Sequence, residues 1–367
     1  MLRTALLAAC LASSAVAQET TPVDRADGQD ERIEFDGLVQ TQLNTTSADA
    51  PDDVALALRR VRLGVVAELT PTLTGRIQAE LAGAAAGGSA ELNEAYVLYR
   101  PAPAFGVLAG KGGRPFGLID ATSAGALVPI ERGARFRGAD PIAQYKLHEA
   151  LAYAGRSVGV QALGDIEGLP VGVAYAAGFF TGSTAEEGGD ADVRQLAARV
   201  TVTPAPGVAV SGAATSRVFA EDDPVGLGAD GALGADPEGE TRRGAGVALD
   251  VELGENGRPG LHVLVQGSAG TLDPYTDARF RAVQGWVAYR LPVAAAAVSA
   301  AEPLLRVSAA DADGPLGDRA GVLVTPGLNV YGPDARSRLM LNLDVFLPSA
   351  DGAETLAAFR AQAQVAF

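Results

Sequence analysis

Positively charged side chains are concentrated in one long segment of an otherwise acidic chain. Residues 111–156 hold seven Lys and Arg residues against four Asp and Glu residues, whereas the whole chain of 367 residues has a formal net charge of −15. Fixed cations around a narrow, poorly hydrated passage lower the electrostatic barrier for anions. The segment is therefore a candidate for a site that binds or conducts anions. Its candidate residues are Lys111, Arg114, Arg132, Arg135, Arg137 and Lys146.

Three further arginines, Arg60, Arg62 and Arg76, lie on the polar faces of segments that alternate like β-strands, so a lumen on that side would receive them. A second interpretation stays open. In it the basic side chains pair with neighbouring acids and only pack the segment, and the adjacent Glu131 and Arg132 are the first such pair that we expect. Arginine also contacts carboxylate and phosphate groups with two parallel hydrogen bonds, so a small organic anion would suit the same residues.

The elements that must position these residues show apolar and polar residues alternating with a period of two. Counting such segments between alternating short and long connections predicts sixteen strands, with lengths close to the ~9–11 residues that a tilted strand needs to cross a bilayer. The long connection at 292–302 is the least regular of the expected turns. The expected strands are residues 31–44, 56–69, 74–83, 90–100, 105–112, 155–165, 170–180, 191–203, 207–218, 242–253, 259–270, 279–291, 303–311, 319–331, 336–347 and 355–367.

Two folds place such strands in opposite ways. A soluble β-sandwich points the apolar face inward, whereas a membrane barrel points it at lipid and lines its lumen with the polar face. Three features favour the barrel: the apolar face is rich in small Ala and Val residues, short turns alternate with longer loops, and the last segment ends on Phe367, a terminal aromatic of the kind that directs outer-membrane assembly. The predicted fold class is all-β, a transmembrane antiparallel barrel of about sixteen strands, which leaves an aqueous channel.

Composition excludes several other classes of protein. The acidic net charge argues against a nucleic-acid partner, which requires a surplus of Lys and Arg. One cysteine excludes a disulfide scaffold, and no internal run of 18 or more apolar residues predicts a membrane-spanning helix. A hydrolase would need His148 or His262 beside a nucleophile, and the best serines for His262 are Ser211 and Ser268. Nothing marks either serine, so we expect no enzyme, no cofactor and no metal site.

The first residues have the pattern of an export signal. Arg3 precedes an apolar stretch, and the small residues at 15–17 suit a signal peptidase, so residues 1–17 are expected to be removed. Residues 18–30 are polar and acidic without periodicity, which predicts a flexible lead-in to a barrel over residues 31–367. The exported part has no cysteine, which suits a bacterial envelope and predicts the outer membrane of a Gram-negative bacterium.

Residues 58–132 resemble the phosphate-selective porin family, the O/P-type porins of Gram-negative outer membranes. The likeness rests on Arg59-Arg60-Val61-Arg62-Leu63-Gly64, Leu69-Thr70-Pro71, Glu94-Ala95-Tyr96-Val97, Pro115-Phe116-Gly117 and Glu131-Arg132. The resemblance implies a passive, trimeric channel of sixteen strands whose long third outer loop folds inward and sets the constriction. Family members that select phosphate line the pore with many Lys and Arg, but this chain has only two lysines, so phosphate specificity does not follow from the resemblance.

The function that we predict is an outer-membrane porin for passive diffusion of small hydrophilic solutes, with anions such as phosphate among the candidates. Its expected partners are these solutes or ions, outer-membrane lipid and lipopolysaccharide, and further copies of the chain in a homotrimer. One alternative is a closed structural or adhesive barrel that binds a partner through acidic outer loops, and another is a soluble periplasmic sandwich. The sequence leaves anion or cation preference open, because the outer loops and the 111–156 segment carry opposite charge.

Overall fold

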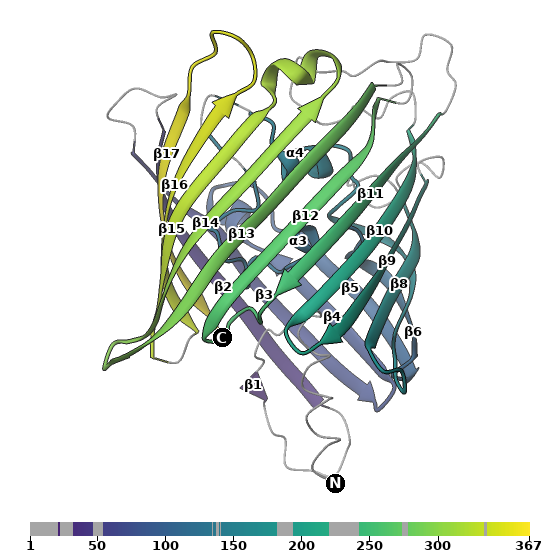
Figure 1. Cartoon of the computed structure of the whole chain (residues 1–367). Helices are drawn as coiled ribbons and strands as arrows, with labels where there is room; N and C mark the ends of the chain where they lie inside the picture. Colours follow the sequence, from purple (N-terminus) through teal and green to yellow (C-terminus); the bar gives the residue numbers. More distant parts are fainter. Residues whose placement is uncertain are drawn as a thin grey trace.

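The chain folds as a closed β-barrel. The computed structural model describes residues 21–22, 32–46, 54–133, 135–136, 139, 141–181, 194–219, 242–273, 278–333 and 336–367. Within these residues sixteen antiparallel strands, β2 to β17, pair each with the next, and β17 pairs with β2 to close the sheet (Figure 1). The predicted fold class is therefore confirmed and the soluble sandwich is excluded. The signal peptide predicted for residues 1–17 lies outside the described residues, as does most of the lead-in.

The observed strands match the expected segments one for one, with ends that differ by a few residues. A two-residue strand, β1 (Thr21–Pro22), also pairs with β2. The barrel strands are β2 (Arg32–Thr46), β3 (Val54–Thr70), β4 (Leu73–Glu80), β5 (Glu91–Ala102), β6 (Phe105–Gly113), β7 (Arg156–Ile166), β8 (Gly172–Thr181), β9 (Arg194–Ala205), β10 (Val208–Phe219), β11 (Arg242–Leu253), β12 (Gly260–Asp273), β13 (Ala278–Ala295), β14 (Val298–Ala312), β15 (Gly321–Tyr331), β16 (Ser337–Pro348) and β17 (Leu356–Ala366). The short helices described are α2 (Ala82–Ala85), α3 (Leu118–Ala121), α4 (Gln144–Ala150) and the 3-10 helix η2 (Gly314–Arg319).

The expected turn at 292–302 is wrong. Strand β13 continues to Ala295 and β14 begins at Val298, with Leu291 opposite Ala301 and Pro292 opposite Ala300. The run of alanines there is apolar on both faces, so alternation cannot mark it as a strand, although small side chains pair without strain. The resulting hairpin projects beyond the neighbouring short turns (Figure 1).

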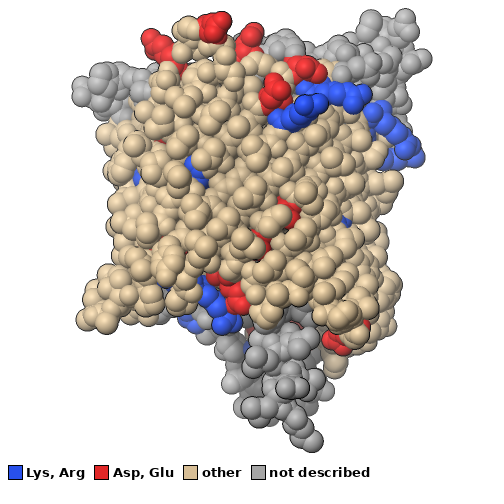
Figure 2. Space-filling view, viewed as in Figure 1, with Lys and Arg blue, Asp and Glu red and all other residues tan. Residues whose placement is uncertain are grey.

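The two faces of the sheet have the polarity of a membrane barrel. On β16, Leu339 and Leu343 are 47% and 44% exposed on the outside, whereas Asn342 and Asp344 between and beside them are buried in the lumen. Figure 2 shows the same arrangement over the strands in view, because charged residues gather toward the two ends of the barrel and the middle is mostly uncharged. An apolar outer belt suits contact with lipid. Among the described residues, no helix has the length and apolarity needed to cross a membrane.

The described residues of the irregular segment between β6 and β7, within 114–155, pack mainly against the inner faces of β10 to β17, with further contacts to β2, β3, β7 and β9. Its backbone amides at Leu118, Ile119 and Ile130 donate to the side chains of Asp250 (3.0 Å), Gln266 (3.1 Å) and Asn342 (2.7 Å). Further wall side chains donate to its carbonyl oxygens, from Arg217, Gln284, Arg306, Asn329 and Arg338. Buried backbone groups need such partners, so the inward polar residues of the strands hold the segment in place.

Apolar contacts strengthen this attachment. Leu118, Ile119, Leu127 and Val128 of the segment form a buried cluster with Leu264, Trp286 and Leu304 of the wall. The inward apolar residues of β12, β13 and β14 are thus covered by the segment. We call this covered side, β10 to β17, the packed wall.

The seam between β2 and β17 is built around a glycine. The amide of Gly37 donates to the carbonyl oxygen of Phe367 (2.7 Å), and the amide of Phe367 donates back (3.1 Å). A Cβ at Gly37 would lie 2.2 Å from the Phe367 ring, so glycine leaves the space that the ring occupies. Inside the lumen, Gln40 and Gln42 donate to Gln364 and Gln362 at 2.7 Å each, which joins the same two strands.

Candidate functional site

A charged cavity opens inside the barrel at the end that carries the longer loops, and we call it the long-loop cavity. It has a volume of about 730 Å3 and is bounded by β2 to β5, β7, β17 and described residues between 131 and 149. Eight basic and four acidic side chains line it, so its lining carries a surplus of four positive charges. The basic residues are Arg59, Arg60, Arg62, Arg132, Arg135, Lys146, Arg156 and Arg360, and the acidic ones are Glu80, Glu91, Glu131 and Glu149.

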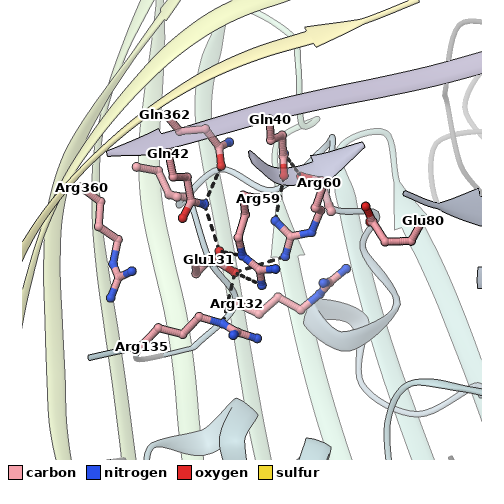
Figure 3. A network of polar contacts seen from close by, with 12 residues as sticks. Gln40, Gln42, Arg59, Arg60, Glu80, Glu131, Arg132, Arg135, Arg360 and Gln362 are labelled. Carbon is pink, nitrogen blue, oxygen red and sulfur yellow. Dashed lines mark hydrogen bonds and ion pairs between the residues drawn. The ribbon is translucent and has the colours of Figure 1, made fainter. Parts of the chain in front are cut away.

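Glu131 lies at the centre of the arginine cluster (Figure 3). Arg59 Nε donates to Glu131 Oε1 (2.6 Å), Arg60 Nη2 donates to Oε2 (3.2 Å), and Arg135 Nε lies 3.7 Å from Oε2. Gln42 also donates to this carboxylate (3.0 Å). One carboxylate is therefore shared by three guanidinium groups, which leaves the cluster positively charged.

A β-bulge explains why two adjacent arginines reach the same carboxylate. Arg60 lies opposite Gln40, but the next paired residue, Leu58, lies opposite Thr41, so Arg59 has no partner of its own on β2. An extra residue of this kind breaks the strict alternation of faces. Both Arg59 and Arg60 can consequently contact Glu131 inside the barrel.

The other cations of the cavity differ in their partners. Arg62, Arg156 and Arg360 form salt bridges with Glu80 (2.9 Å), Glu94 (2.9 Å) and Asp344 (2.6 Å). Arg132 instead donates to the carbonyl oxygens of Ile119 and Thr122, and its guanidinium lies 5.8 Å from the Tyr145 ring centre. Within the described part of the chain, Arg132 has no carboxylate partner. The expected pairing of Glu131 with Arg132 is therefore wrong, because Glu131 is occupied by Arg59, Arg60 and Arg135.

Titration in the 114–155 segment follows from burial and neighbouring charge. Burial by itself raises the pKa of Glu131, but Arg60 and Arg59 outweigh it and hold this pKa well below the ordinary value. Burial and the nearby Arg217 lower the pKa of Arg114 to about 9, which still leaves the guanidinium charged at neutral pH. Glu131 and Arg114 therefore both remain ionised under physiological conditions.

Of the nine predicted site residues, five line the long-loop cavity: Arg60, Arg62, Arg132, Arg135 and Lys146. Arg76 faces the lumen but is buried between Asp36 (2.9 Å) and Glu94 (2.7 Å). Arg114 is also buried, where it donates to Ser157 (2.7 Å), Gln195 (3.2 Å) and the carbonyl oxygen of Ala154. Both residues hold elements together rather than line this cavity. Arg137 lies outside the described residues.

Lys111 is a correction, because it faces away from the lumen. It lies in register with Ala95 on one side and Val158 on the other, and Ala95 pairs with Ile77. Ile77 and Val158 are 60% and 49% exposed on the outer surface. Cross-strand neighbours share a face, so Lys111 belongs to the outer surface and not to the pore.

Both histidines are buried and have polar partners inside the barrel. His262 lies 2.9 Å from Glu252, and Ser211 lies 2.8 Å from Thr201. His148 on α4 contacts Asp120 (Nδ1 to Oδ2, 3.0 Å) and Ser268 (Nε2 to Oγ, 2.8 Å), in the order found in hydrolytic triads. Ser268 is covered by the same helix that carries His148, so uncovering the serine would remove its base. The three residues fasten α4 to the wall.

A second cavity, the short-turn cavity, opens at the other end of the barrel with a volume of about 790 Å3. Strands β7 to β9 and the turns before β4 and β6 bound it. In the described portion of the chain, no group of three or more His, Cys, Asp or Glu residues could hold a metal ion. The acidic loops around Glu186 and Glu221, on which the adhesive alternative depends, lie outside the described residues.

Comparison with known proteins gives one family and a set of shared folds. The family model for phosphate-selective porin O and P matches residues 37–231. A search of curated proteins finds no match. The anion-selective porin from Comamonas acidovorans superposes with a TM-score of 0.63 at 13% identity, over 92% of this chain and 100% of that one. The outer membrane channel DcaP of Acinetobacter baumannii gives 0.60 at 14% identity, over 94% and 99%. The trimer form of Vibrio cholerae OmpT gives 0.57 at 14% identity, over 92% and 100%.

Proposed function

Because the chain belongs to the phosphate-selective porin O and P family, it is an outer-membrane porin for passive diffusion, and we propose that it prefers small anions. The observation that carries this proposal is the charge of the long-loop cavity, where basic side chains outnumber acidic ones by eight to four. A water-filled passage between low-dielectric walls focuses the field of such charges on a passing ion. Anions are concentrated there and cations are repelled.

The 114–155 segment is the proposed constriction of this channel. It supplies Glu131, Arg132, Arg135 and Lys146 to the cavity from one side, and Arg59, Arg60 and Arg62 face them from β3. The route for ions then runs beside β4 to β8, because the segment packs against β10 to β17 and is also bonded to β2 and β3 through Glu131. We further propose that residues 1–17 are removed on export, that the barrel is a homotrimer, and that its rim contacts lipopolysaccharide.

The measurement that tests the proposal is the reversal potential of the purified protein in a planar bilayer under a KCl gradient. Stepwise conductance with a reversal potential that favours chloride is expected. A potential that favours potassium would contradict anion preference, and a folded barrel without conductance would favour the closed adhesive barrel. Lys111→Gln is the matched control, because it removes a charge from the outer face and should leave the reversal potential unchanged.

A further inference from the structure

The inner face of β7, β8 and β9 carries apolar and small residues at the short-turn end. Two rows of cross-strand neighbours run across it: Leu163–Ala176–Arg199 and Asp165–Ala174–Thr201. All six residues line the short-turn cavity. The outer neighbours Val160 and Phe179 are 54% and 48% exposed on the other face, which places these rows in the lumen. A leucine and two alanines thus border the lumen of a channel for hydrophilic solutes.

The packed wall offers the comparison that makes this feature unusual. There the inward residues Leu264, Trp286 and Leu304 are covered by the 114–155 segment and are almost fully buried. On β7 and β8, by contrast, Leu163, Ala174 and Ala176 are only half-buried and form the lining of a cavity. Packing within the described part of the chain therefore explains why the residues of the packed wall are apolar. It does not explain the apolar residues on β7 and β8.

Arg199 adds a positive charge beside this apolar surface. Among the residues that the structure describes it has no salt bridge, and its Nη1 atom is buried without a hydrogen-bond acceptor. Of the acids that line the cavity, Asp165 is paired with Arg100 at 2.5 Å, and Glu167 is exposed at the rim. Arg199 is therefore the cation in this cavity that is available to an incoming anion.

The spacing of the row fits a small amphipathic ion. Neighbouring strands lie ~4.8 Å apart, so the Cα atoms of Leu163 and Arg199 are separated by about 10 Å across Ala176. The small side chain of Ala176 leaves a shallow groove between them. The carboxylate of a small amphipathic ion can therefore meet Arg199 while its apolar body covers Ala176 and extends toward Leu163.

We propose that the short-turn cavity is a subsite for small organic anions that carry an apolar body. The carboxylate contacts Arg199, and the apolar body lies over Ala176 and Leu163. This assignment rests on the proposed anion preference and narrows its substrate class. The long-loop cavity admits anions by charge, and the short-turn cavity then favours those with an apolar part over inorganic or polyhydroxylated ones.

The probes are benzoate and gluconate, two monovalent carboxylates of which only benzoate has an apolar body. Each is added to the full-length protein in a planar bilayer, and the concentration that halves the chloride current is measured. Benzoate is expected to reduce the current at a lower concentration than gluconate. Leu163→Gln should raise the half-blocking concentration of benzoate about fivefold, because about 40 Å2 of apolar contact is lost. The half-blocking concentration of gluconate should stay unchanged.

Three further variants separate the subsite from a general loss of structure. Arg199→Gln should weaken both probes, whereas Ala176→Leu, which fills the groove, should weaken benzoate alone. Thr203→Val is the matched control, because Thr203 lies on the same face of β9 but outside the cavity lining, so its replacement should not weaken benzoate. Two measurements establish that each variant barrel has folded: the single-channel conductance in KCl, and the difference in electrophoretic mobility between unboiled and boiled samples.

Two outcomes overturn the subsite: equal effects of benzoate and gluconate on the native protein, or a benzoate value that neither Leu163→Gln nor Ala176→Leu changes. Either can occur in a channel that still prefers chloride, in which case only the subsite fails. A native channel that prefers potassium would instead contradict the proposed function.

Discussion

Reversing the charge of Arg135 should sharply reduce the anion preference of the channel. The Arg135 side chain is 50% exposed in the long-loop cavity and lies 3.7 Å from Glu131, so its replacement disturbs little of the packing. Arg135→Glu changes the lining from eight basic and four acidic residues to seven and five, which halves the positive surplus. The variant therefore tests the charge of the cavity rather than its shape.

The size of the effect follows from Coulomb's law. One charge at about 8 Å in water changes the energy of a monovalent ion by about 0.5 kcal/mol. A change of two charge units acts with opposite sign on chloride and potassium. The difference between the energies of the two ions in the cavity therefore changes by about 2 kcal/mol before screening. Screening reduces this to about 1.6 kcal/mol at 0.01 M salt and about 0.9 kcal/mol at 0.1 M. The chloride to potassium permeability ratio should consequently fall about fifteenfold in the dilute solution and about fivefold in the concentrated one.

The assay is the reversal potential under KCl gradients at these two mean concentrations. Arg135→Gln changes one charge unit instead of two. The permeability ratio should therefore fall by the square roots of these factors, about fourfold and about twofold. Lys111→Glu makes the same two-unit change on the outer face and should alter the ratio little. If folded Arg135→Glu channels keep the native ratio at both concentrations, ions do not pass this side chain and the proposed route is refuted.

Four other changes test separate parts of the structure. Glu131→Gln should increase chloride preference by about fourfold at 0.01 M salt, since it adds one positive unit, and reversal potentials would detect it. Because the pKa of Glu131 is held below its ordinary value, its stabilising salt bridges should persist as the pH falls from 7 to about 5 and weaken only below the ordinary glutamate pKa. The temperature at which the folded barrel loses its unboiled electrophoretic mobility, measured at each pH, would follow this change. Gly37→Ala should impair closure of the barrel by clashing with Phe367, whereas Gly75→Ala, with no atom within 4 Å of its added Cβ, should not, as unboiled electrophoretic mobility would show. His148→Phe should weaken the attachment of α4 by about 1–3 kcal/mol, because it removes the hydrogen bonds of the imidazole to Asp120 and Ser268, and more frequent voltage-induced closure in bilayers would reveal it.

The strands are predictable because each has an apolar outer face and a mostly polar inner face, which meets either the lumen or the polar groups of the 114–155 segment. Apolar and polar residues therefore alternate with a period of two along each strand, and this alternation is enough to locate all sixteen strands. It failed only at residues 292–302, where alanines make both faces alike. The confirmed fold therefore follows from local pattern, whereas that one turn depends on pairing between strands.

The candidate site was less predictable, because its residues depend on register and on distant partners. Arg59 would point outward under strict alternation, and only the bulge opposite Gln40 and Thr41 brings it to Glu131. The sequence predicts Lys111 in the pore because it is the first cation of the 111–156 segment, whereas its register with Val158 puts it on the outer face. Arg360 enters the cavity from the last strand, which no local signal connects to residues 59–62. Alternation across β17 could have placed Arg360 in the lumen, but not beside this cluster.

The seam at Gly37 and Phe367 has a consequence for the order of folding. Gln40 and Gln364, one of the two glutamine pairs that join its strands inside the lumen, are separated by 324 positions in the chain. Bringing together the ends of so long a loop costs about 5 kcal/mol of chain entropy, beyond a constant term. The cost is far smaller once β2 to β16 are already paired, since the sheet itself then carries the two edges toward each other. Until β17 joins it, β2 presents an edge that is unpaired over residues 38–46, and such an edge is open to pairing with another chain.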